Sequence, residues 1–200
     1  MNLKPLLSES LFQGLYLKTN EYFREKIDNK KQTEDKIKTL AGAYLLQYGL
    51  KRQGFDPERV KIETVEKGKP YIAGTFFNIS HSGDLAVCAF GDSEIGVDIE
   101  KIRPASERVK NKISLPSERA KISAAKQIIR LWTRKEAFGK CLGSGIGEDI
   151  FKIDLMGDTV YYNGNTYGIR TLCFDEYYLS VCTENDMPNT EIIKVKPTLD

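Results

Sequence analysis

Residues 128–142 read IIRLWTRKEAFGKCL and carry the clearest helical pattern in the chain. One stripe at three- and four-residue spacing suits packing against a core and consists of Ile128, Leu131, Lys135, Phe138 and Leu142. Steps of four residues place Trp132, Glu136 and Lys140 on a neighbouring side of the same helix. Gly143 follows directly, as is typical of a helix end, so the sequence predicts a helix over residues 124–142.

Strand-like segments surround this helix in a repeated order. A second amphipathic helix is predicted over about residues 31–50, ending at Gly49. Strands separated by turns, one of them at residues 81–84, are predicted at 14–17, 60–65, 76–80, 85–90, 95–100, 150–155, 159–162, 167–173, 177–183 and 192–195. The polar stretch 101–126 is predicted to be helical only in pieces. The order strand, helix, strands occurs twice, and residues 84–88 (DLAVC) resemble 178–182 (YLSVC), which indicates an internal duplication.

Composition limits the classes of protein to consider. A chain of 200 residues forms one large domain or two small ones, and 40% hydrophobic and 29% charged residues are ordinary for a globular fold. The net charge of +2 is too small for binding nucleic acid through a broad basic face. The sequence has neither a run of 18 apolar residues nor a signal-peptide pattern, so we expect a cytoplasmic protein without membrane contact. The four cysteines lie far apart, which favours buried, reduced thiols over a zinc site.

A first candidate site lies on the predicted strand 96–100 (GVDIE). Alternation along a strand places Asp98 and Glu100 on one face, with Cα atoms about 6.5 Å apart. Two carboxylates at this spacing suit Mg²⁺ or another divalent cation. The alternative is an amphipathic strand with a solvated acidic face.

A second candidate site is the Glu136 and Lys140 pair, one turn apart on the helix. On its own this is a surface ion pair worth about 0.3–0.5 kcal/mol. The neighbouring Trp132 and Phe138 argue instead that this helix lies against a sheet.

The segment 78–83 (NISHSG) holds the only histidine, His81. Two hydroxyls, an imidazole and free backbone amides at a strand end form an anion-binding arrangement. The alternative is a structural histidine. The sequence lacks the nucleophile elbow of a Ser-His-Asp hydrolase.

In this order, the motifs resemble those of the 4′-phosphopantetheinyl transferase superfamily, in its Sfp-type (holo-acyl or peptidyl carrier protein synthase) branch. The resemblance covers about residues 30–183 and rests on 67–70 (KGKP), 77–82 (FNISHS), 96–100 (GVDIE) and 132–140 (WTRKEAFGK). It implies an α+β fold that is a pseudo-dimer of two similar halves, each a helix packed on an antiparallel sheet. We expect the halves at residues 1–93 and 94–184, with a tail at 185–200 and the active site between the halves.

The resemblance also implies an activity and its residues. Such enzymes transfer the 4′-phosphopantetheine arm of coenzyme A to a serine of an apo acyl or peptidyl carrier protein and release adenosine 3′,5′-bisphosphate. By resemblance, Asp98, Glu100 and Glu136 would hold Mg²⁺, and Glu136 would also take the proton of the carrier serine. Lys140 would neutralise charge on the diphosphate. Coenzyme A phosphates would be held by Ser80 and His81, with help from Lys69 and from Lys38, which stands where many relatives have an arginine.

Alternatives stay open at this point. A non-catalytic coenzyme A or carrier-protein binding module would have lost part of the acidic and lysine set, which is intact here. An unrelated Mg²⁺-dependent phosphotransferase is disfavoured because the chain has no G-x-x-x-x-G-K-[ST] loop. A basic run is either a carrier-facing surface or a solvated helix face, and consists of Lys110, Lys112, Arg119, Lys121 and Lys126. We expect a monomer, since a pseudo-dimer needs no second chain to complete its site.

Overall fold

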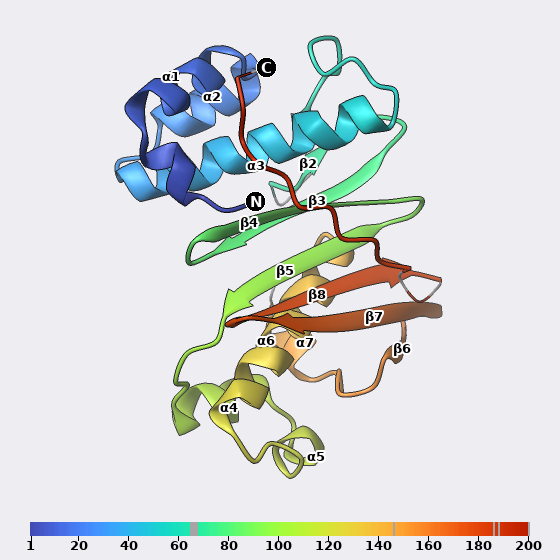
Figure 1. Cartoon of the computed structure of the whole chain (residues 1–200). Helices are drawn as coiled ribbons and strands as arrows, with labels where there is room; N and C mark the ends of the chain where they lie inside the picture. The colour runs from blue at the N-terminus through green and yellow to red at the C-terminus, as the bar shows by residue number, and fades with distance from the viewer. Residues whose placement is uncertain (65–67, 146, 186, 188, 200) are drawn as a thin grey trace.

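A computed structural model describes residues 1–64, 68–145, 147–185, 187 and 189–199. Its N-terminal part consists of helices on a β-hairpin (Figure 1). The helices are η1 (Lys4–Leu7), α1 (Glu9–Leu17), α2 (Glu21–Asp28) and α3 (Thr33–Arg52). The hairpin strands are β3 (Phe76–Ser82) and β4 (Leu85–Gly91), and a small separate pair comprises β1 (Glu63–Thr64) and β2 (Pro70–Tyr71). Helix α3 packs on the hairpin through residues such as Leu46, Phe77 and Phe90.

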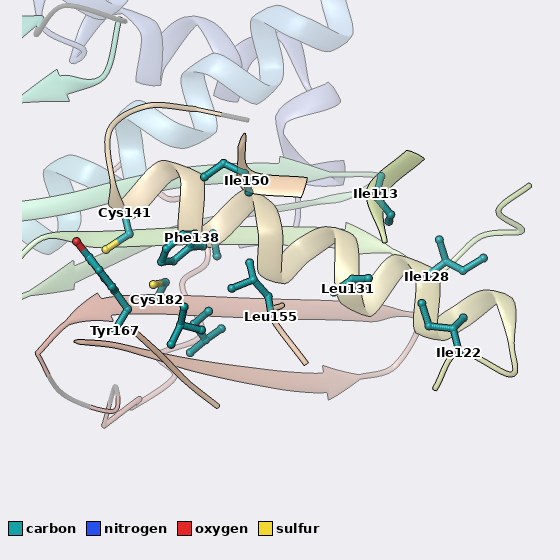
Figure 2. Packing of buried hydrophobic residues seen from close by; sticks show 13 residues of the cluster. Ile113, Ile122, Ile128, Leu131, Phe138, Cys141, Ile150, Leu155, Tyr167 and Cys182 are labelled. Carbon is teal, nitrogen blue, oxygen red and sulfur yellow. The ribbon is translucent and has the colours of Figure 1, made fainter. Parts of the chain in front are cut away.

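The C-terminal part is a helix on an antiparallel sheet. The strands lie in the order β5 (Ile95–Lys101), β8 (Tyr177–Glu184), β7 (Asn165–Phe174), β6 (Thr159–Tyr162). The helices are α4 (Glu107–Ile113), α5 (Pro116–Arg119), α6 (Ala125–Cys141) and α7 (Glu148–Phe151). Figure 2 shows Leu131, Phe138 and Cys141 of α6 packed with Tyr167 and Cys182 of the sheet. The chain therefore has a mixed helical and antiparallel-sheet fold, which confirms the α+β class.

Hairpin β3–β4 and strand β5 lie side by side between the two parts (Figure 1). An apolar cluster joins them, with Phe76 and Val87 on the hairpin and Val97, Ile99 and Leu179 on the larger sheet. The tail returns over the N-terminal helices, where the Tyr44 hydroxyl donates to the Lys196 carbonyl at 3.3 Å. Both the hairpin and the tail therefore connect the two parts.

The long elements agree with the sequence predictions, except that the first helix does not end at Gly49. Gly49 lies inside this helix, where a Cβ atom would collide with the Phe90 ring. The two helices occupy Thr33–Arg52 and Ala125–Cys141, and Gly143 takes a φ of 67° just beyond the second. Within the polar stretch, α4 and α5 are short, as predicted. The strands predicted at 85–90, 95–100, 159–162, 167–173 and 177–183 are also confirmed.

Several short predictions are wrong. Residues 14–17 belong to helix α1, where Leu15 is buried in the core shared with α3, because a short apolar run does not distinguish helix from strand. Residues 150–155 form α7 and a loop. The backbone carbonyls that would bond to a neighbouring strand instead accept hydrogen bonds from side chains. Lys135 donates to the carbonyls of Phe151 and Ile153, and Arg134 donates to the carbonyl of Leu155.

Smaller corrections concern strand ends and thiols. Of the strand predicted at 60–65, only Glu63–Thr64 is extended and paired among the described residues; residue 65 lies outside them. Strand β3 continues through His81 to Ser82, so the turn is confined to Gly83 and Asp84. Residues 192–195 form no strand. All four cysteines are free, as expected. Cys141 and Cys182 are buried, Cys88 is half-buried and Cys173 is exposed, so the expectation of burial is wrong for Cys173 and only partly met by Cys88. No helix of the described residues is both long and apolar enough to cross a bilayer.

Candidate active site

A cavity of about 390 Å³ lies where α2, α3 and β3 meet β5 and α6. It brings together residues from all three sequence motifs. Those from the N-terminal part are Phe23, Lys26, Lys30, Lys38, Thr39, Pro70, Ile79, Ser80 and His81. Those from the C-terminal part are Asp98, Glu100, Trp132, Glu136 and Lys140. The cavity wall thus combines three lysines of the N-terminal part with three carboxylates and Lys140 of the C-terminal part.

Gly96 allows helix α6 to lie directly against β5. A Cβ atom at this position would stand 2.0 Å from the Ala137 carbonyl oxygen and 2.4 Å from the Cys141 amide nitrogen, both backbone atoms of α6. Only a residue without a side chain permits this approach. The close contact places Glu136 and Lys140 of the helix opposite Asp98, two residues along the strand from Gly96.

Asp98 is buried, with 4% of its surface exposed. Its Oδ1 accepts a hydrogen bond from Ser80 Oγ at 2.9 Å and an ion pair from Lys140 Nζ at 2.8 Å. Its Oδ2 is buried with no hydrogen-bond partner among the described residues. Burial raises the pKa of Asp98, against the opposing effects of Lys140 and Ser80. A solvated acidic face is therefore excluded for this carboxylate.

Glu136 and Glu100 face the same cavity. Burial, and then the negative charge of Asp98, raise the pKa of Glu136 above its ordinary value. Glu100 Oε2 accepts hydrogen bonds from Ser82 Oγ at 2.9 Å and from Arg103 at 2.8 Å. The carboxylates therefore stand close enough to destabilise one another's charges.

The donor set suits a hard divalent cation. The unpartnered Oδ2 of Asp98 is a buried acceptor that such an ion would satisfy, so the residues fit a metal. Among the described residues, however, no three acidic, histidine or cysteine side chains are gathered closely enough to form a complete ligand set as they stand.

Lys140 binds across elements rather than along its own helix. Its Nζ donates to Ser80 Oγ at 3.1 Å, to the Val97 carbonyl at 3.2 Å and to Asp98. The surface ion pair with Glu136, considered from the sequence, is therefore wrong. Lys140 instead fastens α6 to both β3 and β5.

The part of the cavity wall that comes from α3 and β3 includes Lys38 and His81. Burial, followed by the charges of Lys38 and Lys140, lowers the pKa of His81. Lys38 Nζ pairs with the exposed Glu34 at 2.5 Å. The lowered pKa favours a neutral imidazole at His81, so the lysines supply the positive charge of this wall.

One predicted residue, Lys69, lies apart from the others. Lys69 is not among the residues that line the cavity; its Nζ binds Glu94 Oε2 at 2.7 Å, and only the adjacent Pro70 reaches the wall. Lys67 of the same motif lies outside the described residues. The sequence interpretation missed Lys26 and Lys30, although both belong to a basic run beginning in α2.

Comparisons with known proteins identify the family of the chain. Residues 94–182 match the family model of the 4′-phosphopantetheinyl transferase superfamily. A 4′-phosphopantetheinyl transferase of Bacillus subtilis is 35% identical over 177 residues, covering 80% of this chain and 79% of that protein. The 4′-phosphopantetheinyl transferase Sfp of B. subtilis strain 168 is 34% identical, covering 68% and 66%. The gsp transferase of Aneurinibacillus migulanus is 28% identical, covering 82% and 76%. The chain belongs to the 4′-phosphopantetheinyl transferase superfamily, a family of enzymes.

Proposed function

We propose that this enzyme transfers the 4′-phosphopantetheine arm of coenzyme A to a serine of an apo acyl or peptidyl carrier protein, in a Mg²⁺-dependent reaction that releases adenosine 3′,5′-bisphosphate. The observation that carries the proposal is that lysines of the N-terminal part and three carboxylates of the C-terminal part line one and the same cavity. Coenzyme A has matching chemistry, because its 3′-phosphate needs cationic partners and its diphosphate needs a cation held by the protein.

The pseudo-dimer organisation is part of this proposal, with halves at 1–93 and 94–184 and a tail at 185–200. Its support is that α3 packs on an antiparallel hairpin and α6 on an antiparallel sheet. A single chain supplies both walls of the cavity, which supports a monomer as the working unit. Four free cysteines suit a reducing compartment such as the cytoplasm.

We assign Asp98, Glu100 and Glu136 as the residues that would hold Mg²⁺. When bound, the ion would supply positive charge to the diphosphate of coenzyme A. Asp98 can offer its free Oδ2 without losing Lys140 or Ser80 from Oδ1. Glu100 and Glu136 would have to turn toward the same point, since their side chains are not gathered there.

Glu136 is proposed as the general base. The carrier serine oxygen forms a bond to the phosphorus that bears the pantetheine arm, the bond from that phosphorus to the bridging oxygen breaks, and the serine proton passes to Glu136 directly or through a water. A carboxylate whose pKa is raised by burial and by Asp98 is a stronger base than one in water. Lys140, which stands one turn along α6, would neutralise charge on the departing diphosphate oxygen.

Coenzyme A phosphates would lie near Lys38 and His81. Lys26 and Lys30 are added to this group because they line the same wall. Ser80 already contacts Asp98, Lys140 and the Ile99 amide, so a phosphate contact would require it to release one of them. Lys69 would likewise have to leave Glu94.

The direct experiment incubates an apo carrier protein with this enzyme, coenzyme A and Mg²⁺ and measures the intact mass of the carrier. We expect a mass gain equal to one phosphopantetheine arm, located on a serine. A chain that binds coenzyme A without any mass gain on acyl or peptidyl carriers would be the binding module instead.

The basic side chains between residues 110 and 126 offer a surface for an acidic carrier helix. Lys121 and Lys126 are exposed, whereas Arg119 is committed to the carbonyls of Asn111 and Ser114. We predict that reversing both exposed lysines to glutamate raises the KM for an acidic carrier several-fold without changing kcat, because long-range attraction mainly affects encounter.

A matched control for this reversal is the double variant Arg59→Glu, Lys61→Glu. It makes the same change in net charge, and both side chains are at least 84% exposed. Equal KM values for the two double variants would remove the basic run from carrier binding.

A further inference from the structure

Strand β3 runs beside β5 in the same direction, joined through side chains. Three polar residues at alternate positions of β3 accept hydrogen bonds from backbone amides of β5. Asn78 Oδ1 accepts from Val97 N at 3.0 Å, Ser80 Oγ from Ile99 N at 3.3 Å and Ser82 Oγ from Lys101 N at 3.1 Å. The repeat of two on both strands keeps the same face of β3 against β5.

We call this row of side-chain hydrogen bonds between β3 and β5 the seam. Its two serines, Ser80 and Ser82, each make a second hydrogen bond, which Asn78 does not. Ser80 Oγ donates to Asp98 Oδ1 and Ser82 Oγ donates to Glu100 Oε2, both at 2.9 Å. In each case the carboxylate belongs to the residue just before the amide that the same hydroxyl accepts from. Asn78 has no such partner, because the residue before Val97 is Gly96.

A hydroxyl has one proton and two acceptor lone pairs. The Ser82 hydroxyl oxygen accepts a hydrogen bond from the Lys101 amide, and the single hydroxyl proton is donated to Glu100. The other donor on that carboxylate oxygen, Arg103, has 58% of its side chain exposed. Ser82 is thus the more sheltered of the two groups that fix the Glu100 side chain.

We propose that Ser82 is a positioning residue for Glu100: by holding Oε2, it limits the carboxylate to the turn that would bring Oε1 to a divalent cation in the cavity. This inference rests on the proposed function and deepens it. Ser82 itself touches neither coenzyme A nor the carrier serine in this role. In keeping with this role, β3 has a hydroxyl at the two positions that lie beside an acidic residue of β5 and an amide at the position that lies beside Gly96.

The test compares Ser82→Ala, Ser82→Thr and Asn78→Ala in the full chain. Threonine keeps the hydroxyl, and Asn78→Ala removes a seam bond without touching a carboxylate. The readout is the Kd for Mn²⁺ with saturating coenzyme A and no carrier. It is measured from the electron paramagnetic resonance signal of free Mn²⁺. Thermal unfolding of each variant reports damage to the seam.

We expect Ser82→Ala to raise the Kd for Mn²⁺ about tenfold, the lower end of the range for residues that orient metal ligands. Ser82→Thr should restore the wild-type value, and Asn78→Ala should lower the melting temperature with unchanged Kd. An unchanged Kd in Ser82→Ala, or an equal loss in Asn78→Ala, would overturn the inference and leave Ser82 as a structural residue. If instead the wild type neither binds Mn²⁺ nor modifies a carrier, the proposed function itself fails.

Discussion

Replacing Gly96 by alanine tests whether the contact between β5 and α6 sets the geometry of the site. The new Cβ atom would lie 2.0 Å from one backbone atom of α6 and 2.4 Å from another, where ordinary contact begins near 3.4 Å. Helix and strand must therefore separate by on the order of 1 Å, because backbone atoms cannot turn aside as a side chain does. This separation would stretch the 2.8 Å ion pair between Lys140 and Asp98 and draw Glu136 away from the strand.

We predict that Gly96→Ala lowers kcat about a hundredfold, since displacements near 1 Å in an active site have effects of this size. The cost in stability should be about 1–3 kcal/mol, typical of overpacking. The assays are the initial rate of carrier modification and chemical denaturation. Gly147→Ala is the matched control, because nothing lies within 4 Å of a Cβ atom there. A Gly96→Ala enzyme with wild-type kcat would refute the reasoning.

Three further predictions concern the buried charges. Burial raises the pKa of Asp98 above the unfolded value of 3.8, so the folded state binds the proton more tightly. The stability that this group contributes is therefore fully present below pH 3.8 and is lost as the pH rises through the folded pKa. Asp98→Asn should accordingly raise the melting temperature of the metal-free protein at pH 7 while abolishing transfer; a variant that melts below wild type would contradict this sign. The transfer rate should rise with pH as Glu136 loses its proton, at a pKa above 4.5. Glu136→Gln should remove that pH dependence and lower kcat about 10²–10⁴-fold, with a smaller change in the coenzyme A affinity measured by calorimetry. A variant that binds coenzyme A weakly but turns over normally would argue against Glu136 as the general base. Lys135 and Glu118 form a fully buried ion pair at 2.9 Å, so Lys135→Met should lower the free energy of unfolding in urea by about 3–5 kcal/mol, and adding Glu118→Gln should recover part of the loss; a single variant as stable as wild type would count against it.

The sequence was informative where residues repeat with the period of an element. The four-residue spacing of Trp132, Glu136 and Lys140 and the two-residue spacing of Asp98 and Glu100 predicted which side chains share a face, and all five line one cavity. These patterns are local, and a long helix or a paired strand preserves them in the fold.

What the sequence left out depends on contacts between distant segments. The loop after α7 was mistaken for a strand because its carbonyls are bound by Lys135 and Arg134, buried cations that the helical pattern does not distinguish from packing residues. Likewise, nothing local indicates that Lys69 pairs with Glu94, or that Ser82 reaches Glu100. Polar residues alternate along β3 in the sequence, but only the structure shows that they form hydrogen bonds with β5.

The most direct test of the central claim follows both products of one reaction. Wild type and Asp98→Ala are incubated with coenzyme A, Mg²⁺ and an apo carrier protein, while carrier mass and adenosine 3′,5′-bisphosphate are measured together. We predict equimolar arm addition and bisphosphate release by the wild type and neither by Asp98→Ala, with the variant still folded by circular dichroism. Transfer at the wild-type rate by Asp98→Ala would contradict the assignment of the three cavity carboxylates as part of the catalytic centre.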